Sequence, residues 1–97
     1  MDAIVVARHV LAKGVVQGVG YREFTRRWAL HLDISGWVRN RRDGSVEAIV
    51  KGRPTGVETM LAEMRKGPPG AAVADLRIAM HDAGEVDEAS FVVRATV

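Results

Sequence analysis

The sequence predicts an α+β fold in which two helices cover one face of an antiparallel sheet of four or five strands. Two segments, residues 21–32 and 54–66, space their apolar residues along one face of a helix. Extended apolar segments come before, between and after them, so the predicted order is β-α-β-β-α-β with a short strand appended. We expect residues 1–97 to form a single domain.

The first strand is predicted over residues 4–13, and its imperfect alternation favours a central position in the sheet. A glycine-rich loop follows, and residues 21–32 then form an amphipathic helix. The apolar stripe of this helix is expected to consist of Tyr21, Phe24, Trp28 and Leu32.

Two further strands, residues 34–39 and 46–51, are predicted to form a hairpin. Asp43-Gly44 between two extended runs indicates a type I′ turn, which needs positive φ at both central residues. The second helix opens at Pro54, where Thr55 and Glu58 have the spacing of a capping box. Its apolar face is expected to consist of Val57, Met60, Leu61 and Met64.

Gly67, followed by two prolines, ends the second helix. Residues 73–80 and 91–97 are predicted as the last two strands, with an acidic loop over residues 82–90 between them. This order of elements is that of the ferredoxin-like split β-α-β sandwich. In that topology the third strand lies beside the first, and the second strand lies beyond the third.

The composition is ordinary for a globular domain and excludes several kinds of chemistry. Hydrophobic residues make up 47% of the chain and charged residues 27%. Because there is no cysteine, disulfides and thiolate catalysis are excluded. The net charge of +2 gives no reason to expect binding to nucleic acid or to a membrane. No apolar run is as long as a secretory signal or a membrane span, so we expect a cytoplasmic protein, and a monomer.

Three glycines mark the loop between the first strand and the first helix: Gly14, Gly18 and Gly20. Glycine permits positive φ and a close approach of a ligand to the backbone. A helix N-terminus presents unpaired N–H groups and a positive dipole end, which together favour an anion such as phosphate. A tight strand-to-helix turn explains the spacing equally well, and neither a Walker loop nor a dinucleotide-binding fingerprint is present.

Arg22 favours the anion site over the simple turn. A cation in the first turn of a helix opposes the dipole by roughly 0.3–1 kcal/mol, and a bound anion would use its charge. Asn40 ends the second strand, where an asparagine is most often a turn residue. It can approach the glycine loop only if the tertiary structure brings the two together.

The other polar and aromatic residues receive structural interpretations. The three histidines lack metal-ligand spacing, and no serine lies in a nucleophile elbow. Arg39, Arg41 and Arg42 are interpreted as a solvated hairpin tip, or as charges that concentrate anions. Trp28 and Trp37 are assigned to the core. An enzyme without a nucleophile, a metal site or an evident general base must work by positioning and electrostatics, as phosphoryl transfer to water allows.

Two motifs closely resemble the acylphosphatase family: Val16-Gln17-Gly18-Val19-Gly20-Tyr21-Arg22 and Gly36-Trp37-Val38-Arg39-Asn40. The resemblance continues through residues 43–46, 66–71 and 91–94, and so spans almost the whole chain. It implies the ferredoxin-like fold predicted above. It also implies hydrolysis of an acyl phosphate to a carboxylate and inorganic phosphate, without a metal or cofactor.

The resemblance further implies which residues act. The residue matching Arg22 would bind the phosphoryl group, and the residue matching Asn40 would orient the attacking water. The substrate's own phosphate would help to accept the proton. The family often has arginine or lysine at the position of Val15, and we expect this difference to act on substrate affinity rather than on chemistry. Backbone amides would complete the phosphate-binding loop, whose residues are Val16, Gln17, Gly18, Val19, Gly20 and Tyr21.

Other functional classes can use the same order of elements. An RNA-binding module needs exposed aromatic residues on its central strands, and the first and third strands have none. A non-catalytic phosphate-binding or anion-binding module, or a maturation domain within a larger protein, would keep the scaffold without the activity. The presence of both Arg22 and Asn40, in a chain that we expect to be complete, favours the enzyme.

Overall fold

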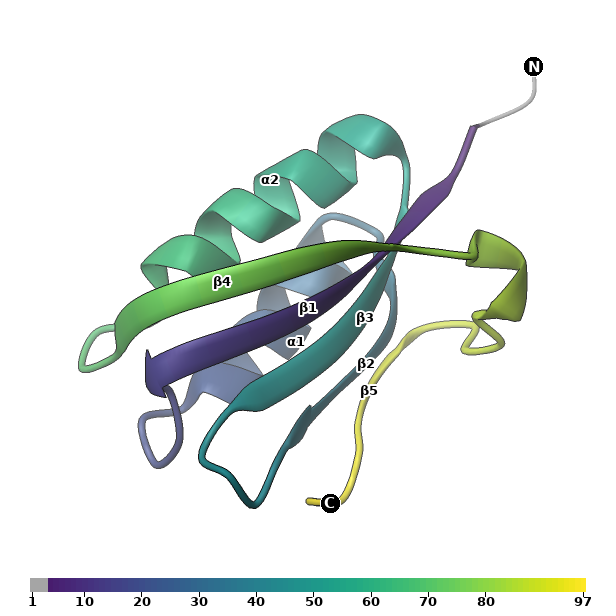
Figure 1. The fold of residues 1–97 in the computed structure, drawn as a ribbon. Coiled ribbons are helices and arrows are strands. Elements are labelled where there is room, and N and C mark those ends of the chain that lie inside the picture. The colour runs from purple at the N-terminus through teal and green to yellow at the C-terminus, as the bar shows by residue number, and fades with distance from the viewer. Residues whose placement is uncertain (1–3) are drawn as a thin grey trace.

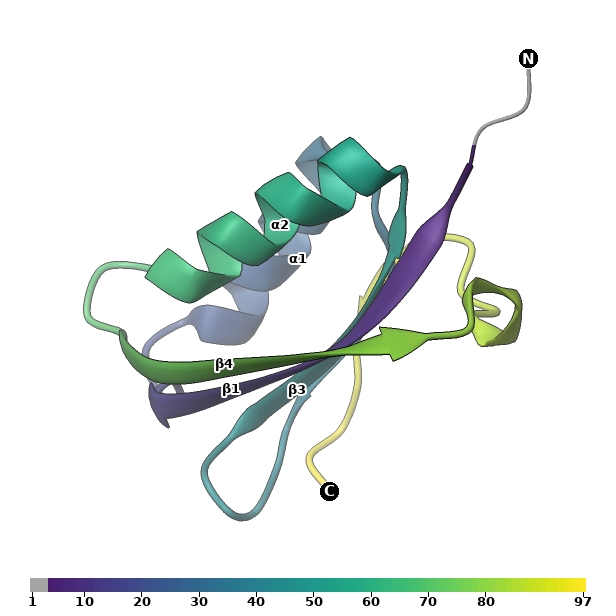
Figure 2. The same cartoon turned by 45° about the horizontal axis from the view of Figure 1, so that its top comes forward.

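Five strands form one twisted sheet, and both helices pack against the same face of it (Figures 1 and 2). The computed structural model describes residues 4–97. The strands are β1 (Val6–Val15), β2 (Ser35–Asn40), β3 (Val46–Gly52), β4 (Ala72–His81) and β5 (Phe91–Val93). The helices are α1 (Tyr21–His31) and α2 (Pro54–Lys66), with a short 3₁₀ turn at Ala83–Glu85.

The strand order is β4-β1-β3-β2-β5, which confirms the predicted ferredoxin-like arrangement. β1 is central and pairs antiparallel with both β3 and β4, and β2 pairs antiparallel with β3. β5 pairs parallel with β2, so the sheet is mixed rather than wholly antiparallel as predicted. The chain after β4 crosses to the opposite edge of the sheet before it runs back beside β2 (Figure 1).

β1 begins and ends two residues later than predicted. It continues through Gly14 to Val15, with a change of register against β4 between Lys13 and Gly14. Gly14 has a φ of 120°, and a Cβ atom there would lie 2.2 Å from the carbonyl oxygen of Ala72. Glycine at this position therefore lets the strand bulge while it stays paired. The bulge comes just before the glycine-rich loop.

The core lies between the sheet and the helices. Alternate residues of the two central strands face the helices and are fully buried, which confirms the predicted pattern of β3. From α2, three of the four predicted apolar residues are buried and Leu61 is half-buried. In β1, β3 and α2, the buried hydrophobic side chains with 0% exposure are Val10, Ala12, Val46, Ala48, Val50, Met60 and Met64.

The face of α1 that packs on the sheet is rotated from the predicted one. Its buried residues are Tyr21, Thr25 and Ala29, whereas Phe24 and Trp28 lie half-buried at the flank. The small side chains of Thr25 and Ala29 let the helix approach the sheet closely, and Tyr21 is the one predicted residue of the stripe that is fully buried. Thr25 satisfies its hydroxyl by donating to the carbonyl oxygen of Tyr21 at 2.8 Å.

The turn between β2 and β3 is not the predicted type I′ turn. The N–H of Gly44 donates to the carbonyl oxygen of Arg41 at 3.1 Å and closes a four-residue turn. Among the described residues, Asp33 is the only non-glycine residue with positive φ, so Asp43 lacks the conformation that a type I′ turn needs. Instead, Asp43 accepts hydrogen bonds from the backbone N–H and the hydroxyl of Ser45, and the positive φ of the turn is at Gly44 alone.

The ends of α2 are only partly as predicted. Pro54 is the first helical residue, and Arg53 before it makes no side-chain capping bond. The predicted capping box of Thr55 and Glu58 is therefore wrong, because Thr55 already lies inside the helix. Proline suits the first position, where a missing N–H breaks no helical hydrogen bond. Gly67 ends the helix with a φ of 71°, as predicted.

The last strand is shorter than predicted. The regular pairing of β5 ends at Val93, although the following tail stays beside β2. The N–H of Arg94 donates to Val38 and the N–H of Val97 donates to Asn40, at 2.8 and 3.2 Å to the carbonyl oxygens. The two donors are three residues apart in the tail, whereas their acceptors are two residues apart in β2, so the bonds do not continue the regular β2–β5 ladder.

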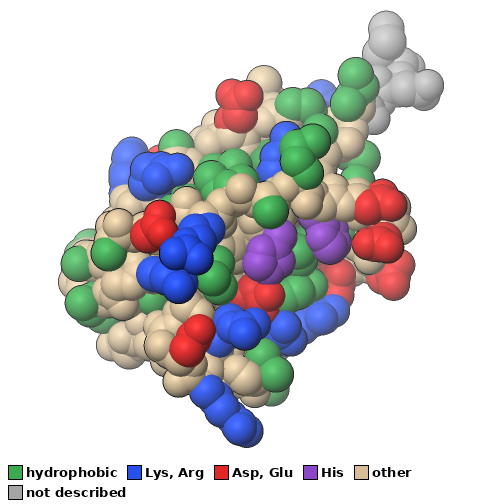
Figure 3. All heavy atoms as spheres, in the orientation of Figure 1, with side chains coloured by type: hydrophobic (Ala, Val, Ile, Leu, Met, Phe, Trp, Pro, Cys, Tyr) green, Lys and Arg blue, Asp and Glu red, His purple; other side chains and the backbone are tan. Residues whose placement is uncertain are grey.

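The second face of the sheet carries no helix, and we call it the open face (Figure 3). Acidic, basic and histidine side chains lie close together over it. Trp37 is half-buried on this face and packs against a second, smaller core cluster, so it lies in the core as predicted but not between the sheet and the helices. The guanidinium carbons of Arg39 and Arg94 lie 4.6 and 4.8 Å from the centre of its ring. Within residues 4–97, no helix is both long and apolar enough to cross a membrane.

Candidate active site

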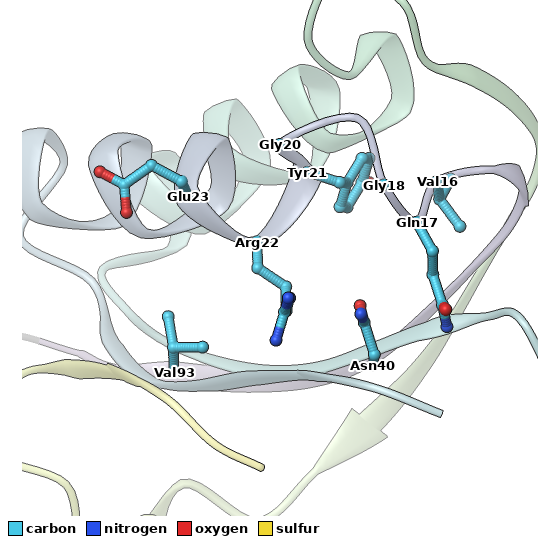
Figure 4. A pocket seen from close by; sticks show the side chains of 9 residues that line it. All are labelled: Val16, Gln17, Gly18, Gly20, Tyr21, Arg22, Glu23, Asn40 and Val93. Carbon is cyan, nitrogen blue, oxygen red and sulfur yellow. The ribbon is translucent and has the colours of Figure 1, made fainter. Parts of the chain in front are cut away.

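A cavity of about 300 Å³ lies where the loop between β1 and α1 meets the end of β2 (Figure 4). This volume is at the small end of the ~300–1,000 Å³ typical of ligand pockets. It is lined by Val16, Gln17, Gly18, Gly20, Tyr21, Arg22, Glu23, Asn40 and Val93. The tertiary structure thus brings Asn40 to the glycine-rich loop, which the sequence alone left open.

The loop presents backbone to the cavity because two glycines turn it sharply. Gly18 and Gly20 have φ values of 73° and 80°, and a Cβ atom at either position would meet nothing within 4 Å. Glycine is therefore needed for the backbone conformation and not for space. Gly20 is the N-cap of α1, and no side chain caps this terminus. The positive end of the helix dipole thus faces the cavity without an internal acceptor.

Arg22 extends from the first turn of α1 into the cavity (Figure 4). Its neighbour Glu23 could neutralise it but binds Arg26 and Arg27 instead, at 2.8 and 3.1 Å. Hydrogen bonds from Arg26 and then Arg27 lower the pKa of Glu23 to about 2. Within the described part of the chain, no carboxylate lies within 4.0 Å of the Arg22 guanidinium. Arg22 is thus a positive charge held in a cavity without a protein partner.

Asn40 reaches the same cavity from the opposite side, because it is the last residue of β2 and faces the helices (Figure 4). Its side-chain oxygen is buried and has no hydrogen-bond partner, and no other buried side-chain nitrogen or oxygen in residues 4–97 is left unpaired. A buried acceptor without a donor is destabilising by about 1–3 kcal/mol. Asn40 Oδ1 is therefore positioned to accept a hydrogen bond from a molecule that enters the cavity.

The side chain of Gln17 joins the loop to the β2–β3 turn. Its Nε2 donates to the carbonyl oxygens of Arg41 and Ser45, at 2.7 and 2.8 Å. Both bonds are long-range in sequence, so they fix the distance between the two walls of the cavity. The sequence placed Gln17 in the phosphate-binding loop but gave no sign of this structural link.

The side chains of the other loop residues are buried, bonded elsewhere or exposed to solvent. Val16 is buried, and the buried hydroxyl of Tyr21 donates to the carbonyl oxygen of Met64 at 2.6 Å, away from the cavity. Burial raises the pKa of this hydroxyl. Val19 packs against the core and does not line the cavity. Val15, the last residue of β1, does not line the cavity either, and 55% of its surface is exposed.

Two lining residues were not predicted. Glu23 lies next to Arg22, and this position in the sequence is the one feature that could have indicated that it lines the cavity. Val93 comes from β5, and its parallel pairing beside β2 could not be foreseen from its local sequence. Among residues 4–97, no group of three or more histidine, cysteine, aspartate or glutamate side chains is arranged to hold a metal ion.

Comparisons with known proteins agree on one family. Residues 8–93 match the family Acylphosphatase. A protein named acylphosphatase from Azoarcus sp. (strain BH72) is 46% identical over 90 residues, which cover 93% of this chain and 90% of that protein. Another, from Rhodopseudomonas palustris (strain BisB18), is 51% identical over 71 residues, covering 73% and 72%.

A solved structure agrees with the two sequences. The structure of an acylphosphatase from Coxiella burnetii superposes with a TM-score of 0.86 at 34% identity, covering 93% of each chain. The matched region includes the loop, α1, β2 and β5, which together form the cavity. The chain described here belongs to the acylphosphatase family of enzymes.

Proposed function

We propose that this protein hydrolyses the carboxyl-phosphate bond of acyl phosphates, with Arg22 and Asn40 as its catalytic residues. One observation carries the proposal: a buried side-chain acceptor without a partner, Asn40 Oδ1, faces the same cavity as an unpaired guanidinium. An anion alone would satisfy Arg22. The unsatisfied oxygen of Asn40 requires a donor as well, and a water molecule is the simplest donor that a hydrolase uses.

In the proposed reaction, the phosphoryl oxygens bind the Arg22 guanidinium and the backbone N–H groups of residues 17–22. Asn40 Oδ1 accepts a hydrogen bond from water and holds its oxygen in line with the bond to be broken. The water oxygen bonds to phosphorus, and the carboxylate leaves with the electron pair of the P–O bond. The proton lost by the water passes to a phosphate oxygen. The products are a carboxylate and inorganic phosphate.

Positioning and charge are sufficient for this reaction because the substrate is already activated. An acyl phosphate is a mixed anhydride whose leaving group is a stable carboxylate, so little acid catalysis is needed. Fixed donors aimed at the phosphoryl oxygens stabilise the charge that develops in the transition state. Orientation of the water by Asn40 removes the entropic cost of finding it in solution.

The activity is tested by release of phosphate from acetyl phosphate and benzoyl phosphate, with and without a chelator. We expect equal hydrolysis in both conditions, since the proposal includes no metal or cofactor. Binding of phosphate without hydrolysis would instead support a non-catalytic phosphate-binding module, which is the alternative on this scaffold.

Asn40→Ala tests the division of roles. It removes the acceptor for water but leaves the Arg22 guanidinium and the loop amides in place. We expect kcat to fall by about 10²–10³, the usual effect of losing one such group, while the inhibition constant for inorganic phosphate changes little. An equal loss of turnover and of phosphate binding would show that Asn40 binds the phosphoryl group instead.

The proposal also takes the protein to be a cytoplasmic monomer that acts as one domain. These three points stay predictions, and residues 1–3 of the expected domain lie outside the described residues. Sedimentation of the protein with and without phosphate tests the monomer.

A further inference from the structure

A buried carboxylate on the open face of the sheet binds three basic side chains. Glu47 lies on β3, and its side chain is only 10% exposed. It accepts hydrogen bonds from Arg39 Nε at 2.8 Å, from Arg41 at 3.3 Å and from His9 Nε2 at 2.7 Å. Figure 3 shows acidic, basic and histidine side chains close together on this face of the molecule. From the sequence, Arg39 and Arg41 were interpreted as part of a solvated hairpin tip, or as charges that concentrate anions.

The two arginines held by Glu47 are the residues on either side of Asn40. Successive side chains of a strand point to opposite faces, so Asn40 faces the cavity because its neighbours face the open side. Asn40 also pairs with Val46, the residue before Glu47. The carboxylate is therefore attached to both flanks of the strand end that carries Asn40.

Backbone hydrogen bonds keep this strand end in the sheet: the N–H of Arg41 donates to Ser45 and the N–H of Val97 donates to Asn40, at 2.9 and 3.2 Å to the carbonyl oxygens. Side-chain contacts that add to them from the open face are few. Arg39 lies against the ring of Trp37, and Arg41 makes a second, longer contact with Asp43, at 4.0 Å. On the cavity side the main link is Gln17, which binds the carbonyl oxygen of Arg41. Without the carboxylate, both guanidinium groups would lose their nearest acceptor and would turn toward solvent.

We propose that Glu47 is a positioning residue for the hydrolysis: by holding Arg39 and Arg41 on the open face, it fixes the orientation of Asn40 on the other. The proposal rests on the function proposed above for Asn40. Glu47 does not line the cavity, because the sheet separates the two, so it would contact neither the substrate nor the attacking water. Its effect is on the placement of the attacking water and not on the binding of phosphate.

The first experiment compares Glu47→Gln with Asp75→Asn. Both changes neutralise a carboxylate of the sheet that binds arginine, but the pair of Asp75 with Arg77 lies on β4, distant from Asn40 in the sheet. We expect Glu47→Gln to lower kcat by about 10- to 100-fold, since a displacement of about 1 Å can cost a factor of 10². KM for acetyl phosphate and inhibition by phosphate stay unchanged, and Asp75→Asn behaves as the parent. Glu47→Asp, which keeps the charge, recovers part of kcat.

The second experiment separates positioning from a general loss of stability. In the Asn40→Ala background, Glu47→Gln has no further effect on kcat, because its effect acts through Asn40. A fall in kcat that persists in this background overturns the proposal. So does a fall matched by Asp75→Asn, or one accompanied by weaker phosphate inhibition.

A third readout does not depend on the reaction. The chain contains a single asparagine, so labelling with ¹⁵N-asparagine gives one side-chain amide signal pair, that of Asn40. We expect this pair to shift or broaden in Glu47→Gln and to stay unchanged in Asp75→Asn. If the protein proves inactive on acyl phosphates, the proposed function fails, whereas an unchanged amide signal in Glu47→Gln overturns the positioning role by itself.

Discussion

The two faces of the sheet are held together by different forces. The face covered by the helices is apolar and fully buried, and its polar groups gather at one end, around the cavity. The open face carries a cluster of charges, with Glu47 at the centre of three basic side chains, as well as the small apolar cluster beside Trp37. Both faces meet at the end of β2, where Asn40 belongs to the first and Arg39 to the second. We therefore expect the hydrolysis to take place on the covered face, and the groups that position Asn40 to lie on the open face.

The proposed role of Glu47 means that the sequence neighbours of Asn40 act on it from the opposite side of the sheet. Charges on the open face have more access to water, so each ion pair contributes less than a buried apolar contact. Their geometry is nevertheless specific, because guanidinium groups bind carboxylates in fixed directions. Substitutions on the two faces should therefore have different effects. Those on the covered face should affect phosphate binding and stability, and those around Glu47 on the open face should affect kcat.

The largest effect is expected from Arg22→Ala. It removes a full charge and several donors from the cavity, so kcat/KM should fall by at least 10²–10³, or about 2.7–4 kcal/mol of transition-state stabilisation. Inhibition by phosphate should weaken in parallel. The control is Arg26→Ala, one turn further along α1, whose partly exposed pair with Glu23 should matter little. Phosphate inhibition that survives Arg22→Ala unchanged would contradict the assignment.

A pair of methionines compares burial with exposure directly. Met60 on α2 is fully buried, and Met80 on β4 is 81% exposed. Met60→Ala should lower the free energy of unfolding by about 2–5 kcal/mol, through lost burial and the cavity left behind. Met80→Ala should change it by less than about 0.5 kcal/mol. Urea unfolding measures both, and similar values for the two would contradict the described core.

The sequence predicted the order of elements because each one has a local signal. Helical spacing, the glycine after α2 and the alternation of β3 all depend on residues close together in the chain. The errors concern features set by distant contacts. The buried stripe of α1 is chosen by the closeness of the sheet, which favours Thr25 and Ala29 over Phe24. The turn at Asp43 depends on how its own side chain binds Ser45.

The candidate site was predicted from its motifs, and its assembly was not. Local sequence gave the loop and Arg22, but it could not show that Asn40 would reach them. Nor could it show the bonds of Gln17 to the β2–β3 turn, or the role of Val93, since β5 pairs with β2 far away in sequence. Glu47 looked like an ordinary polar residue of an alternating strand. Its partners became visible only when three elements were brought together.

Tyr21→Phe should separate structure from chemistry inside the cavity. The hydroxyl of Tyr21 satisfies a carbonyl oxygen in the last turn of α2, which the helix itself leaves unpaired. Its loss should lower the free energy of unfolding by about 1–3 kcal/mol. Because the hydroxyl points away from the cavity, kcat/KM should stay within a few-fold of the parent. A large loss of kcat/KM in a folded variant would show that this hydroxyl takes part in the reaction.

The smallest effect concerns the pH dependence of the open face. Burial alone would raise the pKa of Glu47, but hydrogen bonds from His9, Arg39 and Arg41 outweigh it and hold the pKa below its ordinary value. A carboxylate with a lowered pKa in the folded state adds stability above its unfolded pKa, and this stability is lost as pH falls through the folded pKa. The parent should therefore be more stable than Glu47→Gln at neutral pH, with a difference that shrinks below about pH 4. Urea unfolding from pH 7 to pH 3 measures this difference. The contributions of carboxylates that both proteins share, such as Glu23, are the same in each and cancel in the difference. A difference that stays constant with pH would mean that the charge of Glu47 does not stabilise this face.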